Sequence, residues 1–256
     1  MRSVAVISDI HGNTTALEAV LEDIRNRDIK FIVCLGDLVG KGPNSSKAVD
    51  RIREVCDVVV LGNWDEFIQN STDSKFLQWH QEQLGSERMS YLSSLPFHFD
   101  FYMSGKYIRL YHASAKSVHH RVVPMVHPRE EKEAMFLNTE WITPLEEGLQ
   151  PDVVGFGDIH AALIEPIDEY KILFNAGSVG NPLDIPQATY AILHGSYGSK
   201  ESSPFSIEIA RVPYDIEKEI NIAKEMGMPG IEAYALELRK AIYRGSAKAK
   251  EILEKA

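Results

Sequence analysis

Near its start the chain reads Val4-Ala5-Val6-Ile7-Ser8-Asp9-Ile10-His11-Gly12-Asn13, an apolar run followed directly by a polar cluster. Four consecutive apolar residues rich in Val are typical of a buried β-strand. The polar cluster then lies at the C-terminal end of that strand, where α/β folds usually hold their ligands. Asp9 and His11 are two positions apart, so both point the same way if the strand continues through them. We interpret this pair as half of a metal site.

Four further apolar runs end in the same way, each in an Asp, Asn or His. The polar ends are Gly36-Asp37 after residues 31–35, Gly62-Asn63-Trp64-Asp65 after residues 58–61, His112 after residues 107–111, and Gly157-Asp158-Ile159-His160 after residues 153–156. Several of these ends include a Gly, which allows backbone and ion to approach closely. A pattern that recurs in five runs predicts that the polar ends converge on one site.

The order of these motifs resembles that of the calcineurin-like metallophosphoesterases, whose pattern is D-x-H, G-D, G-N-H-D or G-N-H-E, an isolated H, and G-H-x-H. Two positions depart from it: Trp64 stands where a His is usual, and Asp158 stands where the first His of G-H-x-H is usual. One branch of this family, which includes small phosphodiesterases and dinucleoside tetraphosphate hydrolases, has the loop N-P-G-S-V-G-x-P-R. A similar segment occurs here as Asn175-Ala176-Gly177-Ser178-Val179-Gly180-Asn181-Pro182. Leu183 replaces the Arg of that loop, which removes a bidentate partner for phosphate.

The resemblance implies a centre of two divalent metal ions bridged by Asp37. Its ligands would be Asp9, His11 and His160 with Asp37 on one ion, and Asn63, His112 and Asp158 with Asp37 on the other. An Asn carbonyl and imidazoles beside carboxylates suit Mn²⁺, Fe, Zn²⁺ or Ni²⁺ better than Ca²⁺. Because Asp158 would add a hard, negatively charged ligand, we expect Mn²⁺ or Fe, with Zn²⁺ or Ni²⁺ as alternatives. The alternative for Asp158 is a residue that misses the metal and only orients a water.

The resemblance also implies hydrolysis of a phosphate ester by a hydroxide that bridges the two ions. The expected catalytic residues are Asp37, Asn63, Asp65 and His112, and the expected substrate contacts are Asn13, Trp64, Asn175 and Ser178. For Asn175 and Ser178 the alternative is a tight turn, because both residue types favour turns. His119-His120-Arg121 and His127-Pro128-Arg129 lie on an excursion that is either a solvated loop or a lid offering cationic groups to phosphate.

Trp64 is informative about the substrate. In the resembled family the usual His protonates the leaving oxygen, whereas an indole is no acid near neutral pH. General acid help is worth about 10²–10⁴ in rate, and it matters most for poor leaving groups. We therefore expect a phosphoanhydride, a nucleotide ester or an aryl ester, unless His119 or His120 supplies the proton. The alternatives for Trp64 are stacking on a nucleobase and filling the core.

Composition limits the partners. The 256 residues, of which 44% are hydrophobic, are enough for one domain with a substantial core. A formal net charge of -10 argues against stable binding of nucleic acid or anionic membranes, and a small phosphorylated substrate then requires bound cations. We see no signal peptide and no apolar run near the roughly 18 residues of a membrane span. Cys34 and Cys56 are expected to be free thiols, which suits a cytoplasmic protein.

The expected fold class is α/β, and the resemblance makes it a calcineurin-like β-sandwich flanked by helices (α/β/β/α) with a helical insertion. Alternating strands and helices in the first quarter of the chain predict a parallel sheet with right-handed crossovers. We expect a single domain over residues 1–256, with the insertion at 64–100 and C-terminal helices at 215–256. The segments 172–174, 189–193 and 206–209 are expected to be antiparallel strands of a second sheet.

We therefore predict a binuclear metal-dependent phosphoesterase that cleaves a phosphoanhydride or phosphodiester, with a dinucleoside polyphosphate or another nucleotide as substrate. The alternatives are a phosphomonoesterase or protein phosphatase, and a non-catalytic metal-binding scaffold protein. A metal-free nucleotide-binding protein fits less well, because the chain has no G-x-G-x-x-G or Walker loop, and Gly40-Lys41-Gly42 is too short to be one. The sequence leaves the oligomeric state open.

Overall fold

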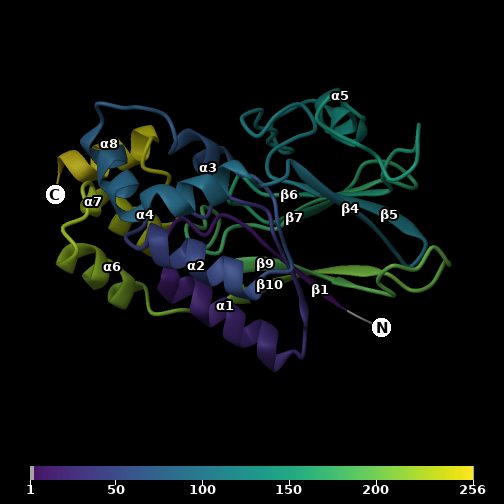
Figure 1. Ribbon diagram of the computed structural model, residues 1–256. Helices are drawn as coiled ribbons and strands as arrows, with labels where there is room; N and C mark the ends of the chain where they lie inside the picture. The colour runs from purple at the N-terminus through teal and green to yellow at the C-terminus, as the bar shows by residue number, and fades with distance from the viewer. Residues whose placement is uncertain (1–2, 256) are drawn as a thin grey trace.

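Two stacked β-sheets form the centre of the computed structural model, which describes residues 3–255 (Figure 1). The first sheet has the order β10-β9-β1-β2-β3 and consists of β1 (Val4–Ile7), β2 (Phe31–Cys34), β3 (Val58–Val59), β9 (Ala188–His194) and β10 (Ser206–Val212). The second has the order β4-β5-β6-β8-β7 and consists of β4 (His98–Met103), β5 (Lys106–Tyr111), β6 (Val153–Phe156), β7 (Leu163–Pro166) and β8 (Ile172–Asn175). Apolar side chains of both sheets, such as Val6 and Phe174, pack together between them.

Helices cover the outer face of the first sheet (Figure 1). The crossovers α1 (Thr14–Asn26) and α2 (Ser45–Val55) follow β1 and β2, and these strands and β3 are parallel, as predicted. The helices expected after residue 64 are also present, as α3 (Asn63–Phe67) and α4 (Lys75–Ser93). Gly85 interrupts α4 with φ 68° and ψ 169°, a backbone conformation that suits glycine.

The outer face of the second sheet carries a thinner layer. It is covered by the segment 112–152, whose regular elements are α5 (Arg129–Glu133) and a 3₁₀ helix, η1 (Ala134–Phe136). The α/β/β/α sandwich is therefore confirmed, although its fourth layer is mostly irregular. Among residues 3–255, no helix has the length and apolar character needed to cross a membrane.

Three C-terminal helices end the chain, α6 (Ile216–Glu225), α7 (Ile231–Lys240) and α8 (Ala247–Glu254). α6 and α7 pack around Ile220, Tyr234 and Leu238, Trp79 of α4 lies against this cluster, and α8 contacts α7. The helices therefore join the helical layer beside α4, as Figure 1 shows in yellow.

The prediction for the late strands is wrong in two respects. Only β8 belongs to the second sheet, where it runs parallel to β6 and antiparallel to β7, a strand that the sequence analysis missed. β9 and β10 extend the first sheet, with β9 antiparallel to both β1 and β10. Because β9 is buried along almost its whole length, it suits a central position in which its backbone groups are paired on both sides. An apolar pattern indicates burial but does not identify the neighbouring strand.

Candidate functional site

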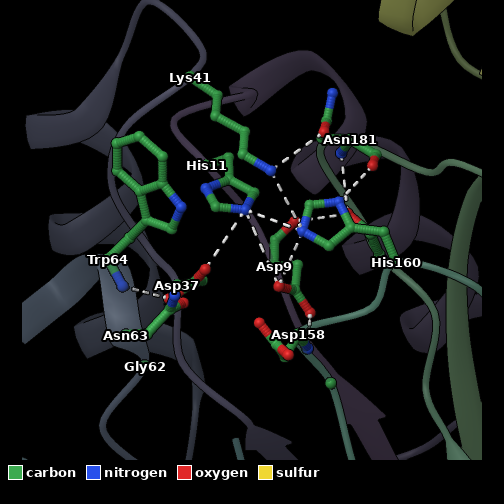
Figure 2. Close-up of polar contacts among 12 residues, drawn as sticks. Asp9, His11, Asp37, Lys41, Gly62, Asn63, Trp64, Asp158, His160 and Asn181 are labelled. Atoms are coloured by element: carbon green, nitrogen blue, oxygen red, sulfur yellow. Dashed lines mark hydrogen bonds and ion pairs between the residues drawn. The ribbon is translucent and has the colours of Figure 1, made fainter. Parts of the chain in front are cut away.

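The polar motifs converge where the C-terminal ends of the strands of both sheets meet (Figure 2). β1 ends at Ile7, so the strand does not continue through Asp9 and His11, and the alternation of side chains along a strand does not set their directions. Instead, six residues at the site have positive φ between 48° and 63°: Asp9, His11, Asp37, Lys41, Asp158 and His160. Such conformations cost about 1–3 kcal/mol each and persist where the surrounding structure enforces them. This concentration of strain marks the strand ends as a functional region.

Three imidazoles at this edge make the same kind of hydrogen bond. Their Nδ1 atoms lie 2.5–2.9 Å from backbone carbonyl oxygens, His11 from that of Val39, His112 from that of Leu35, and His160 from that of Asn181. A carbonyl only accepts, so each Nδ1 carries the hydrogen. In its neutral form each imidazole therefore directs the lone pair of Nε2 at the centre of the site, which is the arrangement of metal-ligating histidines.

Four residues bring possible ligand atoms within 4.8 Å of one another: Asp9, His11, Asp37 and His160. The Nε2 atoms of His11 and His160 are 3.2 Å apart. Nε2 of His160 is also 3.1 Å from Oδ1 of Asp9, an oxygen that is buried and makes no hydrogen bond to the described residues. Lone pairs that face one another without a hydrogen between them repel, so this donor set fits a cation that binds all of them.

A second set of ligand atoms shares Asp37. Oδ2 of Asp37 is 3.4 Å from Nε2 of His11, and Oδ1 is 3.4 Å from Nε2 of His112. Nε2 of His112 is in turn 3.1 Å from Oδ1 of Asn63. The backbone N–H of Trp64 donates to Oδ1 of Asp37 over 2.8 Å and fixes its carboxylate. Asp37 thus presents one oxygen to each set, and both sets fit divalent ions.

Electrostatics favour positive charge at the centre. Burial raises the pKa of Asp37 well above its ordinary value, and the nearby carboxylates of Asp9 and Asp65 raise it further. Burial alone would lower the pKa of His112, but the carboxylates of Asp37 and Asp9 raise it to about 9. Neighbouring carboxylates raise both pKa values, because they concentrate negative charge in a buried place that a divalent ion would neutralise.

Asp158 has a different environment from the other predicted ligands. Its carboxylate forms a bidentate ion pair with Arg121, at 2.8 Å from Nε to Oδ2 and 2.6 Å from Nη2 to Oδ1. Its backbone N–H donates to Oδ2 of Asp9 over 3.1 Å. Asp158 is not part of the four-residue cluster around His160. Its carboxylate anchors a cation, and its role as a metal ligand stays a prediction.

Asp65, predicted to be catalytic, lies under the site. Its carboxylate accepts hydrogen bonds from the backbone N–H groups of Asp37, Leu38 and Gly62 over 2.8–3.1 Å. These contacts hold two ligand-bearing loops together. Asp65 therefore holds the backbone at Asp37 in place, and its catalytic role stays a prediction.

Three predicted substrate contacts are occupied by the protein itself. Asn13 caps α1 through the N–H of Ala16, Asn175 closes a turn through the N–H of Gly177, and Ser178 donates to the carbonyl of Asp9. All three are buried, and the cavity wall formed by the described residues does not include them. These hydrogen bonds fit turn and cap positions, the alternative that the sequence left open for Asn175 and Ser178, and a role of the three residues in substrate binding stays a prediction.

A cavity of about 520 Å³ opens beside the candidate metal ligands. Its wall includes the candidate ligand His160, the cations Lys41, Arg121 and Arg244, and the aromatic residues Trp64, Phe76 and Tyr243. Trp64 is thus the predicted substrate contact that reaches a cavity. From the excursion that was predicted to be either a solvated loop or a lid, Arg121 contributes a cation to the cavity wall, whereas His119 pairs with Glu66, and His120 contacts Ser114 at 3.0 Å.

Lys41 is the site residue that the sequence analysis missed. Its side chain is buried, and Nζ lies 3.3 Å from Nε2 of His160 and 3.3 Å from Oδ1 of Asn181 (Figure 2). Burial lowers the pKa of Lys41 to about 8, although nearby carboxylates oppose the shift. The flanking glycines Gly40 and Gly42 were the available signal, because they allow the chain to turn sharply into the site.

Residues 1–197 match the family described as the calcineurin-like phosphoesterase superfamily domain. The chain is 33% identical over 230 residues to the uncharacterized protein MJ0912 of Methanocaldococcus jannaschii, covering 84% of this chain and 89% of that protein. A metallophosphoesterase from Sphaerobacter thermophilus shares the fold with a TM-score of 0.73 and 22% identity, covering 94% of this chain and 100% of that chain. The hypothetical protein PH1004 from Pyrococcus horikoshii does so with a TM-score of 0.72 and 21% identity, covering 96% and 100%. This chain belongs to the calcineurin-like phosphoesterase superfamily.

Proposed function

We propose that the protein is a phosphoesterase that depends on two divalent metal ions and hydrolyses a phosphoanhydride or phosphodiester bond. The observation that carries this proposal is the convergence of three Nε2 lone pairs on the two oxygens of Asp37 and on Asp9. One ion would be held by Asp9, His11, Asp37 and His160, and the other by Asp37, Asn63 and His112. When bound, such ions activate a water for attack and neutralise the phosphoryl charge. Mn²⁺ or Fe suits this mixture of carboxylate, amide and imidazole ligands.

The protein's own residues orient the reaction. Backbone carbonyls fix the three imidazoles, and Asp65 fixes the loop that carries Asp37. Lys41 is a cation beside the ligand His160, where an ammonium repels metal ions unless an anion lies between them. Lys41 therefore suits a hydrogen bond from Nζ to a phosphoryl oxygen of the substrate.

The substrate class follows from the groups around the cavity. Trp64 is no acid, and His119 and His120 bind Glu66 and Ser114 instead of facing the cavity. If the enzyme does not protonate the leaving group, the substrate must have a good one. A nucleotide phosphate is a good leaving group, whereas a serine alkoxide is not. A dinucleoside polyphosphate is the substrate that we favour. The free thiols of Cys34 and Cys56 suit a cytoplasmic location.

Product analysis of diadenosine tetraphosphate incubated with the Mn²⁺-loaded protein tests the proposal. We expect ADP as the only product, and no ADP from the Asp37→Asn variant. Turnover of an aryl phosphodiester without turnover of the tetraphosphate would retain the metal chemistry and change the substrate to a diester. Bound Mn²⁺ with no turnover of either compound would favour the non-catalytic scaffold.

A Trp64→His variant tests the argument from the leaving group. A histidine at this position restores a group able to donate a proton, so hydrolysis of phenyl phosphate should increase relative to that of p-nitrophenyl phosphate. We expect a change in this ratio of about 10-fold or more. An unchanged ratio would contradict the missing-acid interpretation.

A further inference from the structure

One part of the cavity wall is formed by residues near the C-terminus, outside the matched family domain. The family match ends at residue 197, whereas Tyr243 and Arg244 follow α7 and face the same cavity as the metal ligand His160. Tyr243 is 49% exposed at this wall, and Arg244 is largely buried, with 22% of its side chain accessible. The C-terminal segment therefore contributes an accessible ring and a fixed cation to the cavity.

Arg244 is held rigidly. Its Nε and Nη2 both donate to Oε2 of Glu237, over 2.8 and 2.5 Å, and its backbone N–H donates to Oε1 over 2.8 Å. Glu237 is fully buried on α7, and its hydrogen bonds with Arg244 lower its pKa even though burial opposes this. Among the described residues, Nη1 of Arg244 has no hydrogen-bond partner. One edge of the guanidinium is thus left for another anion.

The same glutamate connects this wall to the metal centre. Oε2 of Glu237 accepts a hydrogen bond from Nδ2 of Asn181 over 3.2 Å. The backbone carbonyl of Asn181 accepts from Nδ1 of His160, and its Oδ1 accepts from Nζ of Lys41. The position of Arg244 relative to the reacting phosphoryl group is therefore set by a continuous chain of buried hydrogen bonds.

Two further rings line the same cavity. Trp64 follows the ligand Asn63 at the start of α3, and Phe76 begins α4, with the guanidinium of Arg244 6.0 Å from its ring centroid. The cavity of about 520 Å³ has the size of a small-ligand site. It combines aromatic rings with the guanidinium of Arg244, whose Nη1 is not taken by Glu237. A purely apolar ligand would not use Arg244, and inorganic phosphate would not use the rings.

We propose that this cavity binds the leaving group of the substrate as a nucleotide, with its base against Tyr243 and a phosphate beyond the scissile bond on Arg244. This inference rests on the proposed function, and it makes the C-terminal segment the element that determines substrate specificity. Glu237 is then a positioning residue for Arg244. The ligand class is an aromatic base joined to at least one phosphate that does not react.

Binding of ADP by isothermal titration calorimetry tests the proposal without turnover. The Asp37→Asn variant serves as the background, and inorganic phosphate is titrated in parallel. We expect Tyr243→Ala and Arg244→Met each to weaken ADP binding by about 10-fold. Binding of inorganic phosphate should change less than about twofold in Tyr243→Ala, because the ring contacts the base alone.

Matched controls separate the cavity from general effects on the C-terminal helices. Tyr170→Ala removes another exposed tyrosine, on the turn between β7 and β8, and Arg239→Met removes an exposed arginine of α7 that pairs with Glu217. Both should bind ADP like the background protein. Arg244→Lys keeps the positive charge and should recover part of the affinity lost in Arg244→Met.

The outcomes distinguish this inference from the proposed function. Equal affinity for ADP in Tyr243→Ala, Arg244→Met and the background would overturn the nucleotide pocket, whatever the activity of the wild-type protein. Parallel losses of ADP and phosphate affinity in Tyr243→Ala would also overturn it, because the ring would then act only through the fold. Tyr243 is exposed, so this variant gives a result even where Arg244→Met disturbs Glu237.

Discussion

The candidate metal site and a cluster around Arg109 in the second sheet both contain buried charge, and they differ in whether their hydrogen bonds are complete. At the candidate metal site, Oδ1 of Asp9 makes no hydrogen bond within residues 3–255, and the Nε2 atoms of His11 and His160 face each other at 3.2 Å. In the second sheet, Arg109 is also fully buried, but its guanidinium meets the carboxylate of Asp100 at 3.0 and 2.9 Å.

The second cluster is satisfied on every side. Nη1 of Arg109 donates to Oδ1 of Asn138 over 3.0 Å, and Nη2 donates to the hydroxyl of Tyr107 over 2.7 Å. That hydroxyl in turn donates to Asp100, which also contacts Nδ1 of His98 at 3.1 Å. Buried charge with a full set of partners stabilises a structure, whereas buried acceptors without donors indicate a ligand. The following predictions test this distinction, from the largest effect to the smallest.

Asp37→Asn should lower the rate of phosphoester hydrolysis by at least about 10³-fold, because it removes the carboxylate shared by both sets of ligands. Elemental analysis should show reduced metal content. The fold should persist, since Oδ1 of an asparagine still accepts from the N–H of Trp64. Near-wild-type turnover with full metal content would contradict the two-metal site.

Arg109→Met should reduce the free energy of unfolding by about 3–5 kcal/mol, because it leaves the carboxylate of Asp100 buried without its main partner. Urea denaturation measures this loss. The double variant with Asp100→Asn should recover part of it, because both charges are then absent. A loss below about 1 kcal/mol in Arg109→Met would show that this cluster is not structural.

Metal binding should stabilise the protein only through the first cluster. Mn²⁺ at about 100 times its dissociation constant adds about 2.7 kcal/mol, which raises the melting temperature by about 5–10 °C in a chain of this size. Thermal unfolding with and without a chelator measures the difference. Arg109→Met should keep this increase and Asp37→Asn should lose most of it. The same increase in both variants would break the distinction between the clusters.

The smallest expected effect is a pH dependence of stability that arises from Asp100 in the second cluster. Burial alone would raise the pKa of Asp100, but hydrogen bonds from His98, Arg109 and Tyr107 hold it below its ordinary value of 3.8. A lowered folded-state pKa contributes stability that is complete above the unfolded-state value and is lost as the pH falls through the folded-state value. The free energy of unfolding, measured with urea, should therefore decrease more steeply from pH 5 to pH 3 for wild type than for the Arg109→Met, Asp100→Asn double variant. Parallel slopes would exclude a contribution from Asp100.

The sequence by itself determined the central features of the protein. The apolar runs that end in Asp9, Asp37, His112 and His160 identified both the buried strands and the residues at their ends. This succeeds because a buried strand needs an uninterrupted apolar run and a site at its end needs polar side chains, and both requirements are local. The helices over residues 14–26 and 45–55 were readable for the same reason.

Tertiary structure alone decided which distant segments meet. The sequence did not indicate that β9 pairs with β1, that Arg121 forms an ion pair with Asp158, or that Lys41 lies beside His160. It also gave no sign that Arg244 and Tyr243 reach the cavity, because their approach depends on how α7 packs. Local residue patterns indicate which side chains could bind a metal ion. The partners of a charged or aromatic side chain, in contrast, depend on contacts between segments far apart in the chain.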